Sequence, residues 1–340
     1  MKNIFVTLGE GVTRDTFMPP HIQKRLESMG NVRYNNYNKR LTEESLAENL
    51  GDVDICVTGW GCPQFTDAVL NKANRLKLIA HVGGSVANHI GKEVFDRNIR
   101  VITGNDIFAL CVAEGTVAYI MLGLRRLALY ADRVQKGLWA NDDYDWYNES
   151  LINQPVGLVG FGAIARYLVP MLRPYNCEIM AYDPFVEDAV FEEYGVKKAT
   201  LKEIALNNKV VSIHASKTDG SRHIIDGEFL NNMRDGALLI NTARGSVVDE
   251  SALATEVTTG RIHAVLDVFE IEPLPMDSRL RNLPNVTLIP HMGGPTIDKR
   301  EYVAKCVLDD IERFIGGANA ELKYEVERSY ALRMTNENLV

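Results

Sequence analysis

The 340-residue sequence lacks the cysteine patterns that define a disulfide framework or a zinc site. Its five cysteines are scattered, odd in number and never spaced as CxxC. Small oxidised folds and tetrahedral metal sites both need such pairs. We therefore predict no metal centre. We expect a reducing, cytoplasmic environment in which each cysteine is a small buried side chain.

Long apolar segments are scarce as well. The opening residues MKNIFVTLGEG carry one lysine and too few apolar side chains for the core of a signal peptide. The longest apolar run, residues 117–124, ends at Arg125 and Arg126. That run is much shorter than the roughly twenty residues that span a bilayer. We expect no membrane partner.

Basic residues are not in excess. The formal charge of -8 argues against a nucleic-acid partner, because phosphate backbones are bound by basic surfaces. An anionic small molecule would need a local positive site. The chain is longer than one core usually supports, and 46% of its residues are hydrophobic, so two domains are expected.

Short β-branched runs alternate with amphipathic segments along the chain, a pattern typical of βαβ units and parallel sheets. The first series is NIFVTL, NVRY, VDICVTGW, LKLIAHV and IRVIT, with helical segments such as residues 43–50 between them. The second series is PVGLVG, CEIMAYD, KVVSIHA, GALLINT, RIHAVLDVF and NVTLIP. Six runs match a dinucleotide-binding sheet.

Two helical segments indicate how the sheets are connected. Residues 112–136 are predicted to form one long helix that bridges two domains, and residues 296–316 form a helix that returns to the first domain. We therefore expect a substrate domain of residues 1–105 and 296–340, and a nucleotide-binding domain of residues 106–295. Ligands would bind at the carboxyl ends of the strands.

The strand-like VGLV is followed by the glycine-rich sequence GFGAIA and a helical segment. The first glycine permits a tight turn, the second lets backbone N–H groups approach a pyrophosphate, and Ala165 is small enough for helix–strand packing. The loop supplies the candidate cofactor contacts Gly160, Gly162, Ala163 and Ile164. Asp183 ends the next strand, eighteen residues after Ala165. An acid there binds ribose hydroxyls and repels a 2'-phosphate, which predicts NAD over NADP.

Three polar residues each follow an apolar run: Arg244 in NTARG, Glu272 in DVFEIEP and His291 in IPHMGG. Arginine binds a carboxylate bidentately, histidine titrates near neutrality, and a neighbouring glutamate orients the ring and favours its protonated form. With a hydride carrier, these groups suffice to reduce a 2-oxo acid or oxidise a 2-hydroxy acid. Taken singly, each has a plainer alternative: an ion-pair partner, a loop cap and a hydrogen-bonded turn residue.

These motifs resemble those of the D-isomer-specific 2-hydroxyacid dehydrogenase family. The resemblance rests on GFGAIA with YDP, LLINTARGSVVDESAL, LDVFEIEPLP and NVTLIPHMGG, and it covers nearly the whole chain. It implies an α/β fold of two doubly wound parallel-sheet domains, with a Rossmann nucleotide domain inserted into a flavodoxin-like substrate domain. It also implies that Arg244 binds the substrate carboxylate and oxo oxygen, and that the His291–Glu272 pair is the acid and base.

Further contacts follow from the resemblance. Thr242, Ala243 and Asp267 would lie on the nicotinamide side of the cofactor, although Asp267 has the alternative of a structural strand-end acid. The glycine loop in LKLIAHVGGSV would offer backbone N–H groups to the substrate carboxylate, although a simple strand-to-helix turn fits these residues nearly as well. This loop comprises Val82, Gly83, Gly84 and Ser85.

The chain departs from the family pattern at several positions. Ser216 stands where a proline usually lines the adenine side, and the HVGGSVANH segment differs from the usual glycine loop. His81, Trp60 and Cys62 are therefore candidate pocket residues, with packing between loops as the alternative for Trp60. These departures indicate an unassigned subgroup, so the particular 2-hydroxy acid stays open.

The aromatic stretch WANDDYDWYNES, with Trp139, Tyr144, Trp146 and Tyr147, predicts an interface arm or a cover over the bridging helix. The family resemblance suggests a homodimer. It leaves open a different class of function, an NAD-sensing corepressor-like binding protein of the same fold. Formate oxidation is disfavoured, because that branch carries glutamine where Glu272 stands.

Overall fold

The computed structural model describes residues 1–36, 40–139, 148–317 and 320–332. It is an α/β structure with one five-stranded and one seven-stranded parallel sheet, which confirms the predicted fold class. The chain divides into two compact units. Unit 1 comprises residues 1–109 and 295–340, and unit 2 comprises residues 110–294.

The sheet of unit 1 has the strand order β2-β1-β3-β4-β5, and all neighbouring strands are parallel. Its strands are β1 (Lys2–Val6), β2 (Gly30–Tyr34), β3 (Ile55–Thr58), β4 (Leu78–His81) and β5 (Arg100–Thr103). Since side chains alternate across a strand, Ile4 and Val6 enter the core on one face and Phe5 enters the core on the other. All carboxyl ends meet at one edge.

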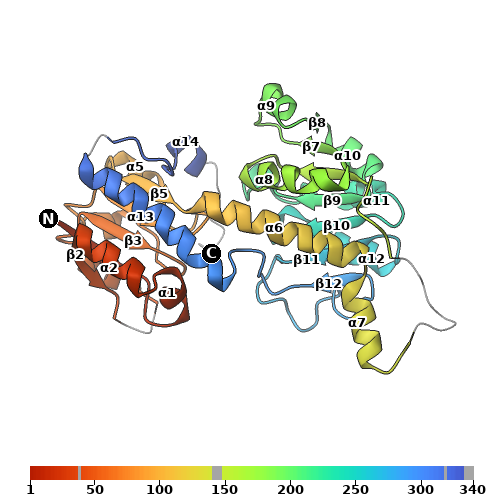
Figure 1. The fold of residues 1–340 in the computed structure, drawn as a ribbon, viewed down its shortest axis with the longest axis horizontal. Coiled ribbons are helices and arrows are strands. Elements are labelled where there is room, and N and C mark those ends of the chain that lie inside the picture. Colours follow the sequence, from red (N-terminus) through yellow and green to blue (C-terminus); the bar gives the residue numbers. More distant parts are fainter. Residues whose placement is uncertain (37–39, 140–147, 318–319, 333–340) are drawn as a thin grey trace. The chain divides into compact units, whose positions relative to one another are not determined.

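Helices cover both faces of this sheet (Figure 1). The core with Ile4 contains side chains from α1 (Val12–Phe17), α2 (Pro20–Met29) and α13 (Arg300–Gly316). The core with Phe5 contains side chains from α3 (Glu43–Asn49), α4 (Asp67–Leu70), α5 (Lys92–Asp96) and α14 (Arg328–Ala331). The helix predicted over residues 296–316 is α13, and it packs against α1 and α2.

The sheet of unit 2 has the order β12-β11-β10-β9-β6-β7-β8. Its strands are β6 (Pro155–Val159), β7 (Glu178–Tyr182), β8 (Lys197–Lys198), β9 (Val210–Ile213), β10 (Leu238–Asn241), β11 (His263–Leu266) and β12 (Val286–Leu288). All six predicted runs are strands. Strand β8 was not predicted, because its two exposed lysines carry no apolar pattern. The direction of winding reverses between β6 and β9.

Two helical layers enclose this second sheet. One core contains side chains from α10 (Leu201–Asn207), α11 (Gly227–Asn232) and α12 (Glu250–Thr258). The other contains side chains from α6 (Asn105–Leu124), α8 (Ala163–Leu172) and α9 (Asp188–Glu193). Both faces of the sheet are therefore covered, as parallel sheets require.

The prediction of a single helix over residues 112–136 is wrong. The structure has α6, which ends at Leu124, and α7 (Leu127–Gln135). Arg126 between them has a φ of 52° and lies in the left-handed region. A residue in that conformation cannot continue a right-handed helix, so the axis changes direction there (Figure 1). Amphipathic patterning alone did not reveal the break.

Helix α6 is also longer than the apolar run in the sequence. By length and composition it meets the criteria for a membrane-crossing segment, with 20 residues and a mean hydropathy of 2.0 in its most apolar window. The length argument drawn from residues 117–124 is therefore wrong. In the structure, Ala113, Ile120 and Leu124 of this helix are buried in the core of unit 2.

Candidate active site

The loop after β6 is shaped by Gly160. Its φ is +94°, and a Cβ at this position would lie 2.6 Å from the backbone nitrogen of Ala215. Only glycine fits that backbone and that space. The close approach joins the loop after β6 to the loop after β9, which is where the sheet reverses direction. Open α/β sheets bind ligands at this point.

The amino terminus of α8 faces open space. Gly162 is the N-cap, no side chain caps the helix, and a Cβ on Gly162 would meet nothing within 4 Å. Ala163 and Ile164 supply the first helical N–H groups. Uncapped N–H groups and the helix dipole favour a phosphate at this position. Ala165, fully buried, packs where helix meets sheet.

Asp183 follows β7 and lies beside the glycine loop. Its Oδ2 accepts a hydrogen bond of 2.8 Å from the Phe161 N–H, and its Oδ1 accepts one of 2.9 Å from the Phe185 N–H. These bonds fix the carboxylate, and each oxygen keeps a further lone pair for a ribose hydroxyl. The uncapped helix, the open space at Gly162 and the fixed acid fit a bound NAD.

Arg244 stands in the loop after β10, directly after Thr242 and Ala243. Buried Asn241 shapes this loop, because its Oδ1 accepts from the Ala243 N–H at 3.0 Å and its Nδ2 donates to the Arg244 carbonyl at 3.1 Å. The Arg244 Nη1 donates to the Ala243 carbonyl at 2.6 Å. Sequence reasoning missed Asn241, although an asparagine that ends a buried strand was a usable signal.

Glu272 and His291 form a pair in the structure. The Nδ1 of His291 lies 2.7 Å from the Oε2 of Glu272, and the Oε1 of Glu272 accepts from the Phe269 N–H at 3.1 Å. Burial by itself would raise the Glu272 pKa. The hydrogen bonds from His291 and Phe269, together with the charges of His291 and Arg244, outweigh burial and lower that pKa. Both side chains remain accessible, with 51% of the His291 side chain and 36% of the Glu272 side chain exposed.

Asp267 holds the loop that carries His291. It is buried, its Oδ1 accepts from the Met292 N–H at 2.6 Å and from the Tyr119 hydroxyl at 3.1 Å, and its Oδ2 accepts from the Gly293 N–H at 2.8 Å. His291 itself has a φ of 51°, in the left-handed region. The carboxylate therefore anchors a strained turn, which supports the structural alternative for Asp267.

The glycine loop of unit 1 follows β4. Thr103 donates its hydroxyl to the Gly83 carbonyl at 2.8 Å and to the Gly84 carbonyl at 2.6 Å. Within the described residues, the N–H groups of Gly83 and Gly84 donate no hydrogen bond. Val82 is buried, and the Ser85 hydroxyl accepts from the Ala87 N–H. The arrangement fixes the carbonyls and leaves two donors for an anion.

His81 lies beneath this loop, since a Cβ on Gly83 would come within 2.1 Å of its Nε2. Its Nδ1 is 3.0 Å from the Thr58 hydroxyl, and burial lowers its pKa to about 3. Cys62 is buried too. Trp60 is half exposed and packs edge-on against Phe17, with their ring centres 5.2 Å apart.

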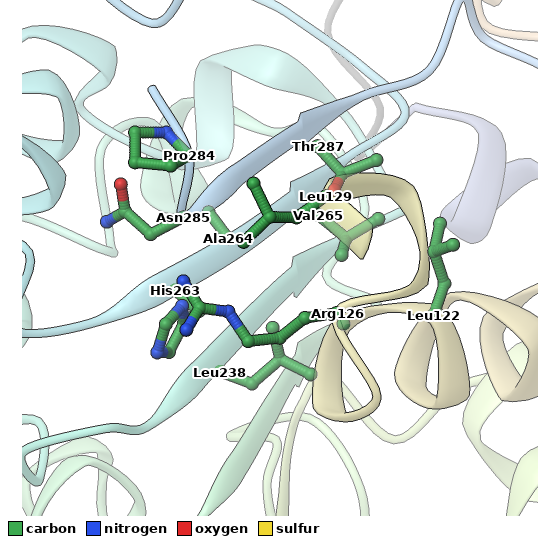
Figure 2. A pocket seen from close by; sticks show the side chains of 11 residues that line it. Leu122, Arg126, Leu129, Leu238, His263, Ala264, Val265, Pro284, Asn285 and Thr287 are labelled. Carbon is green, nitrogen blue, oxygen red and sulfur yellow. The ribbon is translucent and has the colours of Figure 1, made fainter. Parts of the chain in front are cut away.

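A hollow in unit 2 lies at the opposite ends of the strands from the predicted cofactor and acid–base residues of that unit. Figure 2 shows it between the junction of α6 with α7 and the amino ends of β10 and β11, which begin at Leu238 and His263. The predicted cofactor and acid–base residues follow the carboxyl ends of the strands. This hollow is therefore not the predicted site. Of the aromatic stretch, Tyr144, Trp146 and Tyr147 lie outside the described residues.

Together these features define an α/β protein in which a glycine-rich nucleotide loop and a hydrogen-bonded His291–Glu272 pair both follow the carboxyl ends of strands of one sheet. Residues 117–293, more than half of the chain, match the family model described as the D-isomer specific 2-hydroxyacid dehydrogenase, NAD binding domain. The chain belongs to this family. NAD is its cofactor, and the family's chemistry is the oxidoreduction of 2-hydroxy and 2-oxo acids.

Curated relatives agree with this assignment. The chain is 31% identical over 88% of its length to a D-3-phosphoglycerate dehydrogenase of Methanocaldococcus jannaschii, of which it spans 56%. It is 35% identical over 71% of its length to an (S)-sulfolactate dehydrogenase of Chromohalobacter salexigens, of which it spans 78%. A Thermotoga maritima hydroxypyruvate reductase is 28% identical over 82% of the chain and 90% of the relative.

Solved structures have the same fold. A protein from Thermus thermophilus superposes with a TM-score of 0.79 at 25% identity, over 96% of this chain and 100% of its own. The D-lactate dehydrogenase of Aquifex aeolicus, solved with NAD and lactic acid, gives a TM-score of 0.75 at 24% identity, over 93% and 96% of the two chains.

Proposed function

We propose that this chain transfers a hydride between NAD and a 2-hydroxy acid or its 2-oxo counterpart. The observation that carries the proposal is the 2.7 Å hydrogen bond between His291 and Glu272, on the unit that holds the nucleotide loop. An exposed imidazole held by a carboxylate is suited to give and take a proton.

Each polar residue then has one task. Arg244 binds the carboxylate and the oxo oxygen and stabilises negative charge as it develops. Glu272 accepts a hydrogen bond from Nδ1, which leaves Nε2 of His291 to protonate the oxo oxygen. In the opposite direction, neutral His291 removes the hydroxyl proton. The bound NAD supplies or accepts the hydride.

The glycine loop of unit 1 is a candidate anion site in this proposal. The free N–H groups of Gly83 and Gly84 are suited to bind a carboxylate. Unit 1 is accordingly the substrate domain and unit 2 the NAD-binding domain. The structure supports this division through the free loop donors on unit 1 and the uncapped helix α8 on unit 2.

The proposal is tested with a panel of 2-oxo acids, with NADH oxidation followed by absorbance. The relatives' names suggest including hydroxypyruvate and the oxidation products of phosphoglycerate and sulfolactate, with bulky and aromatic acids beside them. Turnover of at least one acid is expected. Tight NADH binding without turnover of any member would refute the dehydrogenase and favour the NAD-sensing alternative.

A variant tests the acid–base pair directly. His291→Gln should lower kcat by about a hundredfold to ten-thousandfold, the usual contribution of a general acid, and should leave NADH affinity unchanged. Near-normal turnover would remove His291 from the mechanism.

We also propose that the chain forms a homodimer through α7 and the segment after it. Leu127, Val134, Leu138 and Trp139 expose large apolar surfaces there, with Trp139 at 72% exposure. Surfaces of this kind commonly become buried in protein contacts. Sedimentation at micromolar concentration should give twice the chain mass, and a monomer would contradict the proposal.

A further inference from the structure

Unit 2 contains a second histidine–glutamate pair that the sequence motifs did not single out. The Nε2 of His223 lies 2.6 Å from the Oε1 of Glu270, and each side chain is about one-third exposed, at 33% and 31%. Glu270 is two residues before Glu272. This pair is separate from the proposed acid and base, His291 and Glu272.

The backbone around His223 is attached to the segment that follows Arg244. The His223 N–H donates to the Ser246 carbonyl at 2.9 Å, and the Ile225 N–H donates to the Val247 carbonyl at 3.1 Å. The Asp249 N–H returns a bond of 3.0 Å to Ile225. The backbone around His223 therefore lies against the stretch of chain that directly follows Arg244.

The backbone around Glu270 contacts that stretch from the other side. A Cβ on Gly245 would lie 1.9 Å from the carbonyl carbon of Phe269 and 2.3 Å from the nitrogen of Glu270, so the two peptides are in direct contact. The Phe269 N–H also donates to Glu272. Phe269 thus links the two loops, since its carbonyl contacts Gly245, the residue after Arg244, and its N–H donates to the carboxylate that holds His291.

Glu270 also forms two hydrogen bonds with Glu250. The Glu250 N–H donates to Glu270 Oε1 at 3.3 Å, and the Glu270 N–H donates to Glu250 Oε2 at 3.0 Å. Burial raises the pKa of Glu250, and the negative charge of Glu270 adds to this rise, against a lowering by the bond from the Glu270 N–H. Two carboxylates are crowded here, and the imidazole of His223 supplies a donor to one of them.

We propose that His223 and Glu270 form a clasp that holds the Arg244 loop against the Glu272 loop. Both are positioning residues, and neither touches the reacting atoms. The inference rests on the proposed function, because the distance between the anion-binding and proton-transferring groups matters only if both act on one substrate. Loosening the clasp then weakens binding of the 2-oxo acid more than it slows proton transfer.

The test compares His223→Ala with His223→Gln, using a 2-oxo acid that the wild type reduces. Loss of one charge-assisted hydrogen bond should raise KM for the acid about tenfold in the alanine variant, with a smaller change in kcat and unchanged NADH affinity. The glutamine variant should stay within about threefold of wild type, since its side-chain amide donates to the same carboxylate.

Glu270→Ala breaks this bond and also the one from the Glu250 N–H, so it should be at least as impaired as His223→Ala, and the double variant should be no worse than Glu270→Ala alone. Lys198→Ala is the matched control, since it breaks an exposed ion pair of 2.5 Å with Asp188 elsewhere in unit 2. It should leave KM unchanged. Hydrogen exchange of residues 244–250 should quicken in His223→Ala and not in His223→Gln.

Several outcomes would overturn the clasp. An unchanged KM in His223→Ala, with reduced thermal stability, would show a purely structural bond. If His223→Gln were as impaired as His223→Ala, or if the effects on KM were additive in the double variant, the His223–Glu270 hydrogen bond would not be what holds the two loops. Should the alanine variants not fold, Glu270→Gln keeps the test open through the same KM measurement. Failure of the proposed function itself would appear separately, as tight NADH binding by the wild type without turnover of any 2-oxo acid in the panel.

Discussion

Asp267 offers a sharp test, because its carboxylate accepts two hydrogen bonds from the turn that carries His291 and a third from Tyr119 of α6. Met292 and the Tyr119 hydroxyl bind Oδ1, and Gly293 binds Oδ2, in a site that is only 2% exposed. Asp267→Ala leaves these donors without a partner. Each buried donor left without a partner costs about 1 to 3 kcal/mol, so three donors should together cost about 3 to 5 kcal/mol. We expect a loss of that size in the unfolding free energy of unit 2.

Two milder variants should give a graded series. Tyr119→Phe removes one donor and should cost about 1 kcal/mol. Asp267→Asn keeps one acceptor oxygen and opposes an amide group to one backbone N–H, so its cost should be intermediate, about 1 to 3 kcal/mol. Urea unfolding followed by circular dichroism measures all three. The order Phe, then Asn, then Ala is the predicted ranking.

The same series separates the two roles considered for Asp267. If the carboxylate serves to anchor the turn, Asp267→Asn speeds hydrogen exchange of the Met292 and Gly293 amides and lowers kcat, while NADH affinity stays at the wild-type value. His291 has a φ of 51°, and a strained turn relaxes when its bonds are lost. An alanine variant within about 0.5 kcal/mol of wild type would refute the reasoning.

Three further predictions concern the nucleotide loop and the acid–base pair. Gly160→Ala should destabilise unit 2 by more than about 2 kcal/mol, because φ is +94° and the new Cβ would clash with Ala215. Gly162→Ala should keep the wild-type stability in urea and should weaken NADH binding, because its Cβ fills the open space at the start of α8. Equal stability losses in the two variants would contradict this prediction. Asp183→Ala should reduce the preference for NAD over NADP by about tenfold or more in kcat/KM, since repulsion of the 2'-phosphate is lost, and unchanged discrimination would count against that assignment. Because the pKa of Glu272 is lowered in the folded protein, its ionised form stabilises the fold above the unfolded pKa of about 4.3, and this contribution is lost as pH falls through the folded pKa. The difference in unfolding free energy between wild type and Glu272→Gln, measured in urea across this range, should therefore shrink on acidification. A difference that grows would refute the prediction.

Much of the site was predictable because its residues follow strands. Gly160, Asp183 and Arg244 each come directly after an apolar run, and the carboxyl ends of parallel strands meet at one edge of a sheet. His223 and Asn241 were missed for the opposite reason. Their importance comes from hydrogen bonds to residues outside the recognised motifs, and such partners leave no local pattern.

The sequence alone determined the two parallel sheets and the family, since alternating apolar runs and glycine spacing are local properties of the chain. It also predicted Glu272 and His291 as an acid–base pair, because each follows an apolar run. Only the tertiary structure decided that Asp267 anchors the turn of His291 and that α6 ends at the left-handed Arg126. Both outcomes depend on contacts between residues that are far apart in the sequence. Tertiary packing determines such contacts, and local periodicity carries no information about them.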